Sequence, residues 1–399
     1  MTVNSNTTNR LTTILITGIN GYIAAHTARV FLQAGFSVRG TVRNAHHPNT
    51  LSLTKALSKY DGSNRLEIVQ VPDITAHKAF DHAVQGVSAI AHLASPVSMT
   101  ATDPEPMMRA AVEGTTSLLS SAASASSEVL KSIVFMSSIS AVYSPEADQG
   151  QNQHQFTSQD WNRSAEQDVA RLGDKTPGYV IYQASKSAAE RAFWRFAEEN
   201  EPPLGWGMAS VCPAPTIGPP LFLPTPIETL SMRAKDIHTI YHGGGIPELS
   251  GTIRATFVDV RDVADIVFGV ITKHLGLQQH TTTTTTTTSP PQEQQTTTSS
   301  SGPTRQERLI CVAAENVSPA QMASILRETY PDRRNIIPEP DREEDSTILA
   351  KLASHLPSTG RKFDSEPARR YMGRDWVGFK QSVLDNAKAF VDAESASSS

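Results

Sequence analysis

The N-terminal part of the chain places a short apolar run directly before a glycine-rich turn. The run TILIT covers residues 13–17 and ends at Gly18, and apolar residues at helical spacing follow over 21–34 until Gly35. A buried strand, a tight turn and an amphipathic helix in this order form the first unit of a parallel β-sheet. This unit therefore limits the fold to those built from parallel strands and crossover helices.

The same alternation of strand-like and helix-like segments continues through the first half of the chain. Strands are predicted at 37–42, 66–71, 88–93, 131–137 and 206–211, and helices at 104–126 and 178–199. Strands that alternate with helices pair in parallel and carry helices on both faces of the sheet. The sequence thus predicts an α/β fold with a doubly wound parallel sheet.

After Pro213 the pattern is less regular and richer in proline, which indicates a smaller C-terminal lobe that binds the substrate at the carboxyl ends of the strands. The predicted division is 1–212 as the main domain, with 256–274 (a strand and then a helix) and 308–314 (a strand) returning to it, and 213–255 with 315–392 as the lobe. Residues 278–303 contain eight consecutive threonines and are predicted to be a disordered surface insertion.

Composition and charge narrow the class of protein. The 399 residues are 38% hydrophobic, and a formal net charge of −5 gives no indication of binding to nucleic acid or to an anionic membrane. We identify neither a signal peptide nor a run of about 18 apolar residues that could span a membrane. Cys212 and Cys311 are expected to be buried free thiols without a metal ion. We therefore expect a soluble cytoplasmic protein.

The turn after the first strand has the features of a dinucleotide-binding loop. Its glycines allow backbone amides to approach a pyrophosphate, and the following helix adds the positive end of its dipole. The spacing is Gly-x-x-Gly-x-x-Ala, with a small third residue for close packing of helix and strand. The alternative is a tight turn that binds no ligand. The cofactor-binding residues predicted here are Gly18, Asn20, Gly21, Tyr22 and Ile23.

The charges after the second strand favour NADP over NAD. NAD-binding folds place a carboxylate at this strand end, whereas the first acidic residue of this chain is Asp61. Arg39 lies in the strand and Arg43 follows it, and a guanidinium at this position suits the 2′-phosphate of NADP. The alternative is that Arg43 is a solvated surface charge.

Two further strand ends supply cofactor candidates. Asp73 and Ile74 follow the third strand, where the carboxylate could bind the adenine amino group and Ile74 could contact the ring. A turn-forming role for Asp73 is nearly as good an explanation. Ala94 follows the fourth strand, where a small residue lets the chain pass along the cofactor. His92, beside it, is assigned no chemistry.

A tyrosine, a lysine and a serine form the predicted catalytic group. Tyr182 and Lys186 are four residues apart in a helical segment and therefore share one face. A nearby ammonium stabilises a phenolate and brings the pKa of the tyrosine closer to neutrality. Ser138, at the end of the fifth strand, could donate to a substrate carbonyl, and Ser137 replaces it if the strand ends one residue earlier.

These motifs together resemble the extended short-chain dehydrogenase/reductase superfamily, which contains NAD-dependent epimerases and dehydratases and has a Rossmann fold. The most similar branch is that of dihydroflavonol reductases, cinnamoyl-CoA reductases and fungal aldehyde or methylglyoxal reductases. The motifs are TGINGYIAAH (17–26), GTVRN (40–44), HLASPV (92–97), AVEGT (111–115), SSISAV (137–142), YQASKSAAE (182–190) and VDVRDVA (258–264). The resemblance implies catalysis by Ser138, Tyr182 and Lys186, a 2′-phosphate at Arg43, and Pro213 near the nicotinamide.

This resemblance leads to an expected activity and leaves alternatives open. The expected activity is NADPH-dependent reduction of a small ketone or aldehyde. A nucleotide-sugar epimerase or dehydratase with bound NAD, and a non-catalytic NADP-sensing protein, are the alternatives. Apolar residues in 213–250 and in the loop 143–178, such as Leu221 and Trp161, favour an apolar carbonyl compound over a sugar nucleotide. The long threonine tract is of a kind common in filamentous fungi, where relatives of this branch often reduce polyketide or other secondary-metabolite ketones. The branch often has asparagine where this chain has Cys212. Both a monomer and a homodimer are compatible with the sequence.

Overall fold

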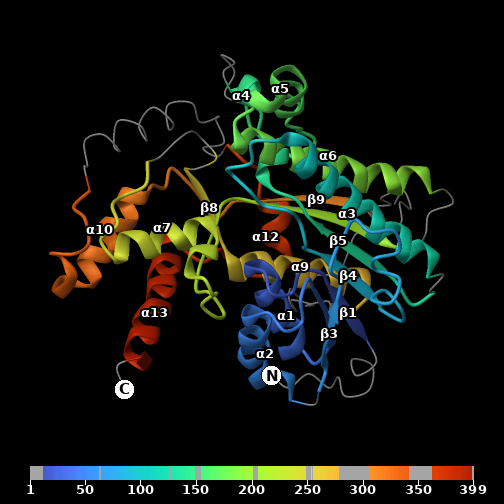
Figure 1. Ribbon diagram of the computed structural model, residues 1–399, viewed down its shortest axis with the longest axis horizontal. Coiled ribbons are helices and arrows are strands. Elements are labelled where there is room, and N and C mark those ends of the chain that lie inside the picture. Colours follow the sequence, from blue (N-terminus) through green and yellow to red (C-terminus); the bar gives the residue numbers. More distant parts are fainter. Residues whose placement is uncertain are drawn as a thin grey trace, which may run out of the picture.

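The computed structural model describes residues 12–62, 64–125, 128–148, 154–200, 205–248, 253, 255–277, 306–340 and 362–397. The predicted insertion at 278–303 lies outside these ranges. Figure 1 shows a large twisted sheet with helices on both faces, and a second group of helices around α7, α10 and α13 beside it. The main sheet carries the glycine-rich turn, so its topology determines where a ligand could bind.

Seven parallel strands form the main sheet, in the order β3-β2-β1-β4-β5-β6-β9. This order confirms the predicted doubly wound parallel sheet. The direction of winding reverses between β1 and β4, and ligands of such sheets bind beside that point. The strands are β1 (Thr13–Ile16), β2 (Ser37–Val42), β3 (Leu66–Gln70), β4 (Ala89–His92), β5 (Ser132–Met136), β6 (Gly207–Pro213) and β9 (Gln306–Cys311).

Alternate residues of the central strands enter two separate cores, one on each face of the sheet. In β1, Ile14 and Ile16 belong to one buried cluster and Leu15 to the other. In β5, Val134 and Phe135 divide between the clusters in the same way. Because side chains of a strand point to opposite faces in turn, a continuous apolar run is what a sheet covered on both faces requires.

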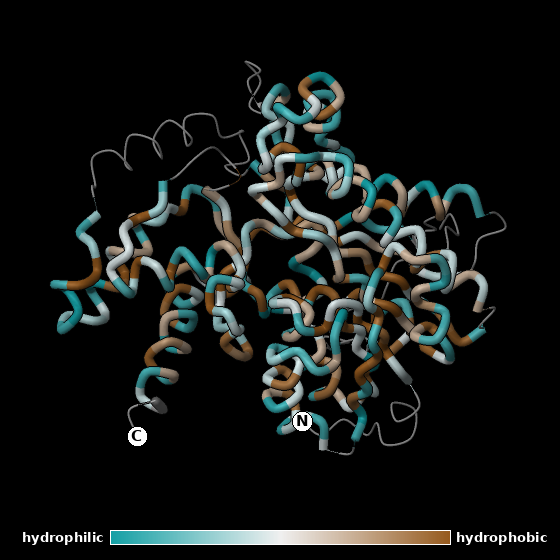
Figure 2. The backbone as a smooth tube through the Cα atoms, viewed as in Figure 1, coloured by the Kyte–Doolittle hydropathy of each residue, from teal (hydrophilic) through white to brown (hydrophobic). Residues whose placement is uncertain are grey.

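The helices that cover the sheet follow from the same pattern. α1 (Tyr22–Gln33) packs with α9 (Val260–His274) on one face, and α3 (Pro104–Ser124) packs with α6 (Gly178–Glu199) on the other. The remaining α-helices are α2 (Pro48–Asp61), α4 (Pro145–Asp148), α5 (Ser164–Leu172), α7 (Met232–Tyr241), α10 (Pro319–Thr329), α12 (Glu366–Met372) and α13 (Phe379–Ser397). In Figure 2, hydrophobic stretches gather where helices meet the sheet, and hydrophilic ones predominate in outer turns.

The helix α2, which follows β2, was not predicted from the sequence. α2 follows β2 directly, and its cap is His47, whose Nδ1 accepts from the amide of Asn49. Histidine is not among the preferred capping residues, and only Thr50, Leu53 and Leu57 of this helix are buried. Both features weaken the sequence signal for a helix.

A small second sheet lies beyond the main one. It contains β7 (Thr216–Ile217), β8 (Thr256–Asp259) and β10 (Ala314–Glu315) in the order β10-β8-β7. The sequence placed all of 256–274 in the main domain, and this is wrong for its strand: β8 pairs with β7 and β10, whereas α9 packs under the main sheet. The segment thus connects the two parts of the structure.

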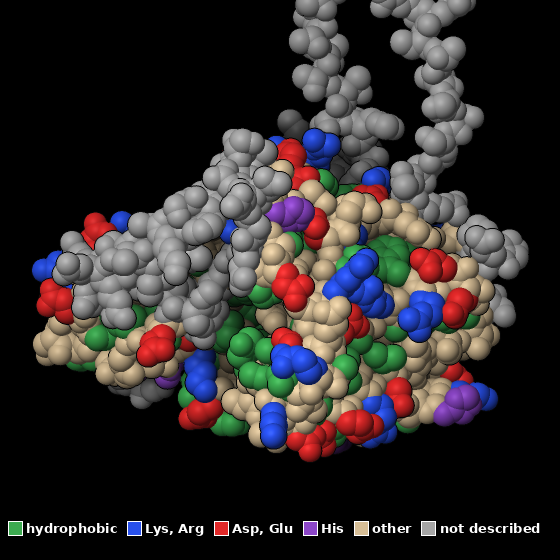
Figure 3. All heavy atoms as spheres, turned by 90° about the horizontal axis from the view of Figure 1, so that it is seen from above, with side chains coloured by type: hydrophobic (Ala, Val, Ile, Leu, Met, Phe, Trp, Pro, Cys, Tyr) green, Lys and Arg blue, Asp and Glu red, His purple; other side chains and the backbone are tan. Residues whose placement is uncertain are grey.

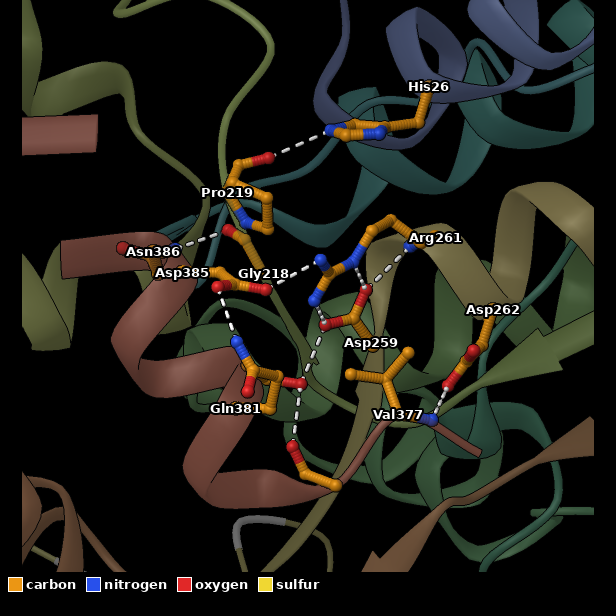
Figure 4. Close-up of polar contacts among 12 residues, drawn as sticks. His26, Gly218, Pro219, Asp259, Arg261, Asp262, Val377, Gln381, Asp385 and Asn386 are labelled. Atoms are coloured by element: carbon orange, nitrogen blue, oxygen red, sulfur yellow. Dashed lines mark hydrogen bonds and ion pairs between the residues drawn. The ribbon is translucent and has the colours of Figure 1, made fainter. Parts of the chain in front are cut away.

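A buried carboxylate joins these two parts. The side chain of Asp259 is fully buried and caps α9 by accepting from the amide of Arg261 at 2.8 Å. It also accepts from the Arg261 guanidinium at 2.8 Å (Figure 4). The hydroxyl of Ser382 in α13 donates to it at 2.6 Å. Arg261 in turn contacts Asp385 of α13 at 2.6 Å. The start of α9 is therefore tied to the C-terminal helix.

The C-terminal helix α13 is also tied to the glycine-rich turn, through the carbonyl group of Gly218. The carbonyl oxygen of Gly218 accepts from the Tyr22 hydroxyl and from the Asn386 amide, each at 2.5 Å. Beside it, His26 Nε2 donates to the Pro219 carbonyl at 2.8 Å (Figure 4). Burial lowers the pKa of His26 to about 4, so the ring is neutral near pH 7. α1, the loop after β7 and α13 therefore share one hydrogen-bonded junction.

Replacing Asp259 by alanine should destabilise the protein by about 2–4 kcal/mol, because the variant removes the cap of α9 and the buried hydrogen bonds to Arg261 and Ser382. The matched control is Asp103→Ala, since Asp103 caps α3 in the same way but is exposed. That variant should cost only about 1 kcal/mol. Urea unfolding measures both, and equal losses would contradict the account of the junction.

Candidate active site

Every residue predicted to bind the cofactor or to act in catalysis lines one cleft of about 750 Å3. The cleft lies at the carboxyl ends of β1, β2, β4, β5 and β6, next to the reversal of the sheet order. Those residues are Gly18, Asn20, Gly21, Tyr22, Ile23, Arg43, Asp73, Ile74, Ala94, Ser138, Tyr182, Lys186 and Pro213. The volume is within the range of known ligand pockets.

The hydroxyl of Thr17 holds the turn after β1 against the loop after β4. Its oxygen accepts from the amides of Leu93 and Ala94 at 3.0 and 2.9 Å, and lies 2.9 Å from Nδ1 of His92. Because the oxygen already accepts two hydrogen bonds, its own proton is directed at Nδ1. Burial lowers the pKa of His92 to about 3, so the ring is neutral and serves as an acceptor there.

The backbone beside this hydroxyl can approach the loop after β4 closely because Gly18 has no side chain. Gly18 has φ +63°, and a Cβ on it would lie 3.1 Å from Cα and Cβ of Ala94. Gly21 is the cap of α1 and has no side chain to bind the first amides of the helix. These amides and the positive end of the helix dipole suit a pyrophosphate. The local geometry therefore fits a dinucleotide.

The two arginines near the second strand have different surroundings. Arg39 donates to Glu67 at 2.7 Å and to the carbonyls of Ala83 and Gln85, so it holds neighbouring segments together. Arg43 is exposed and lines the cleft. The arrangement leaves Arg43 as the arginine at the cleft end where a 2′-phosphate would lie.

Asp73 and Ile74 sit at the same end of the cleft. Asp73 accepts from the amide and the hydroxyl of Thr75 at 2.8 and 2.7 Å, and these bonds lower the pKa of its carboxyl group. It therefore forms the turn that the sequence offered as the alternative, while still lining the cleft. Ile74 packs on α3 at Gly114, where an added Cβ would come within 2.7 Å of its side chain.

Ser138, Tyr182 and Lys186 meet at the other end. Ser138 caps the short 3-10 helix η2 (Ile139–Ala141) and is hydrogen-bonded to the side chain of Tyr182. Ser137 instead donates to Glu190 at 2.7 Å. Nζ of Lys186 lies 3.4 Å from the Met136 carbonyl and 5.9 Å from the centre of the Tyr182 ring. Ser138, and not Ser137, is thus the serine in contact with the tyrosine.

The protonation states follow from burial. Burial raises the pKa of Tyr182, and its hydrogen bond with Ser138 opposes this rise only in part. The sequence argument expected Lys186 to lower this pKa, but the lysine is directed at the Met136 carbonyl. Burial lowers the pKa of Lys186 to about 8. Near pH 7 the site therefore holds a protonated phenol beside an ammonium group.

Strand β6 carries both Pro213 and Cys212, the residue at which the branch often has asparagine. Pro213 ends β6 and lines the cleft, whereas Sγ of Cys212 lies 3.7 Å from Glu190 on the buried side. Burial raises the pKa of the Cys212 thiol to about 12, so it stays protonated. Both Cys212 and Cys311 are free and buried.

Sequence reasoning missed several residues that support or line the cleft. They are Thr17, Asn162, Glu190, Arg233 and Arg308. Glu190 could have been found, because it follows Lys186 by four residues and shares its helix face. Arg308 could not, since it reaches Glu190 across 118 residues of chain and no local pattern marks it.

Neither a membrane-spanning helix nor a metal-binding cluster is found among the described residues. Within the described ranges, no helix combines the length and apolar character of a membrane span. The same residues include no cluster of three or more His, Cys, Asp or Glu that could bind a metal ion. Figure 3 shows acidic and basic side chains interspersed over the described part of one face of the molecule.

Comparisons with known proteins place the chain in a family. Its residues 14–282 match the NAD-dependent epimerase/dehydratase family. A ketoreductase of Penicillium rubens is 36% identical over 47% of this chain and 53% of its own length. The NADPH-dependent methylglyoxal reductase of Saccharomyces cerevisiae is 28% identical over 63% of this chain and 71% of its own. A crystal structure of yeast methylglyoxal/isovaleraldehyde reductase with NADPH has a TM-score of 0.72 at 23% identity, covering 96% and 99% of the two chains.

The family match covers well over half of the chain, so the protein belongs to the NAD-dependent epimerase/dehydratase family. This confirms the superfamily predicted from the motifs. The likeness to the yeast structure confirms the fold along nearly the whole chain.

Replacing Arg43 by alanine should raise the KM for NADPH by about 10- to 100-fold, because a charged hydrogen bond to the 2′-phosphate is lost. The KM for NADH should change little, since NADH lacks this phosphate. Arg370→Ala removes an exposed arginine outside the cleft and serves as the control. Initial rates at varied cofactor concentration give both constants, and an equal change with NADPH and NADH would refute the assignment.

Proposed function

We propose that this protein reduces a ketone or aldehyde to an alcohol with NADPH, using Ser138, Tyr182 and Lys186. The observation that carries the proposal is the single cleft, which has Arg43 at one end and these three residues at the other. The reaction class and the cofactor predicted from the sequence agree with the relatives, which include a ketoreductase and an NADPH-dependent methylglyoxal reductase.

The residues that would hold the cofactor are those of the turn, the neighbouring strand ends and Pro213. When bound, NADPH supplies the hydride that reduces the carbonyl carbon. The amides at the start of α1 suit the pyrophosphate, and Arg43 suits the 2′-phosphate. Lys186, buried at the far end, is placed to bind ribose hydroxyls. The chain thus orients the cofactor along the full length of the cleft.

Tyr182 supplies the proton in this reaction. Its hydroxyl donates to the carbonyl oxygen, and the raised pKa keeps the proton in place until charge develops on that oxygen. Ser138 donates a hydrogen bond to the same oxygen and stabilises the charge. The hydrogen bond from Ser138 is the contact that favours the phenolate left behind, and the Lys186 ammonium lies 5.9 Å from the centre of the tyrosine ring. A protonated tyrosine beside a charged lysine is the state that reduction requires.

The part of the cleft next to this group is mostly apolar. Val97 is 66% exposed and Met99 is 38% exposed, and Met232 and Ile253 line the same cleft. These side chains favour an apolar carbonyl compound, and a polyketide or other secondary-metabolite ketone belongs to that class. Free cysteines fit a reducing compartment, which supports action in the cytoplasm.

The family also includes epimerases and dehydratases, and an activity of that kind can be distinguished from carbonyl reduction by the cofactor that the protein retains. An epimerase or dehydratase of this fold keeps NAD bound through turnover. Mass spectrometry of the purified protein distinguishes the two, because tightly bound NAD favours the epimerase and exchangeable NADP favours the reductase.

Tyr182→Phe should lower kcat for carbonyl reduction by about 10²- to 10⁴-fold, because the proton donor is lost. NADPH binding should remain, since the aromatic ring is kept. Tyr179→Phe removes the hydroxyl of an exposed tyrosine on the same helix and should leave kcat unchanged. The assay follows NADPH absorbance with a panel of ketones and aldehydes. Wild-type protein that binds NADPH but reduces none of them would favour the sensing role.

A further inference from the structure

A buried ion pair lies directly behind the catalytic helix. Glu190 follows Lys186 by four residues in α6, and its side chain is fully buried. Its two oxygens accept from Nε and Nη2 of Arg308 at 2.8 and 3.0 Å, a two-point pairing. Arg308 lies in β9, the last strand of the main sheet. The helix that carries Tyr182 and Lys186 is therefore fixed to the edge of the sheet by a charged pair.

The Glu190 carboxylate also contacts the two strands between α6 and that edge. Ser137, after β5, donates to it at 2.7 Å, and Ser210 of β6 donates at 2.6 Å. Ser137 directly precedes Ser138, and Ser210 lies on the strand that ends at Pro213. The Glu190 carboxylate therefore fixes the position of α6, which carries Tyr182 and Lys186, relative to the ends of β5 and β6.

Arg308 holds the chain that leads from Ser138 back to α6. Its guanidinium donates to the carbonyls of Ser158 and Asp160 and, at 3.2 Å, to that of Ala141 in η2. It also lies over the ring of Trp161, 3.9 Å from the ring centre. This segment includes η2, which Ser138 caps, so the position of Ser138 depends on the same arginine.

Glu190 also acts on the charge of Lys186. The groups that face the lysine are Tyr182 and Glu190 from α6, His92 from β4, Cys212 from β6 and, beyond Glu190, Arg308 from β9. His92 is neutral and the Cys212 thiol is protonated, so Glu190 is the anion of this group. Burial disfavours the ammonium form of Lys186, and the Glu190 carboxylate opposes that effect.

We propose that Glu190 is a positioning residue whose charge, balanced by Arg308, keeps Lys186 in the ammonium form and holds the catalytic side chains in register. The inference rests on the proposed function, because it acts through Lys186 and Ser138. Neither Glu190 nor Arg308 lines the cleft, so their effect on the reaction is transmitted through these side chains.

The test compares Glu190→Gln, which removes the charge and keeps the shape, with Glu190→Asp, which keeps the charge on a shorter side chain. The matched control is Glu166→Gln. Glu166 of α5 pairs at 3.1 Å with Arg191, which lies next to Glu190 in α6, but both side chains of this pair are partly exposed. For each variant, kcat and KM are measured from neutral to alkaline pH with a carbonyl compound that the wild type reduces. The pH dependence of NADPH binding, followed by cofactor fluorescence, gives a readout independent of turnover.

Glu190→Gln should move the alkaline limb of kcat, and of NADPH binding, to lower pH by about one unit or more, since Lys186 loses its proton more easily. At pH 7, kcat should fall about twofold for a one-unit shift, since about half of Lys186 then remains protonated, while KM for the carbonyl compound changes less. Glu190→Asp and Glu166→Gln should keep the alkaline limb at the wild-type pH. The double variant Glu190→Gln/Arg308→Gln leaves no uncompensated buried charge and serves if the single variant fails to fold; its shift should have the same direction but be smaller, because the Arg308 charge is removed too.

An unchanged alkaline limb in folded Glu190→Gln or in the double variant would overturn the inference, even if kcat fell. The same limb shift in Glu166→Gln would overturn it as well. A wild type that reduces no carbonyl compound would instead count against the proposed function, and the binding curves would still decide the effect of Glu190 on Lys186.

Discussion

The parallel pairing of seven strands is the constraint on which the site depends. Because all seven run in one direction, their carboxyl ends share one edge, and residues far apart in the chain meet there. The reversal of order between β1 and β4 separates the helices after these strands and leaves the cleft between them. The Thr17 hydroxyl and the close approach of Gly18 to Ala94 fix the spacing at this point. A few short contacts thus determine where an extended ligand fits.

Two buried charged groups connect this edge to the rest of the molecule. Asp259 and Arg261 join α9 to α13 (Figure 4), and the Gly218 carbonyl joins α13 to Tyr22 of the glycine-rich turn. Glu190 and Arg308 perform the corresponding role at the catalytic end. Asp259 and Glu190 are fully buried, so removing the arginine that pairs with either carboxylate leaves a buried charge without that partner, which makes the geometry of the cleft costly to change.

The main sheet and the residues of the cleft could be predicted because their signals are local. Glycines, strand ends and the spacing of Tyr182 and Lys186 are all visible within about ten residues, and the sheet topology brought them together as expected. The pairing of β8 with the small sheet and the contact of Arg308 with Glu190 could not be predicted, since each joins distant segments. The pKa of Tyr182 was misjudged for a related reason: spacing places Lys186 on the same face but does not say that its ammonium faces the Met136 carbonyl.

A crystal structure of the protein grown with NADP would test most directly whether one cleft holds the cofactor between Arg43 and the Ser138–Tyr182–Lys186 group. We expect the 2′-phosphate on Arg43, the pyrophosphate at the start of α1, and the nicotinamide between Tyr182 and Pro213. A cofactor bound in the opposite direction, a 2′-phosphate remote from Arg43, or NAD retained from purification in place of NADP would contradict this arrangement.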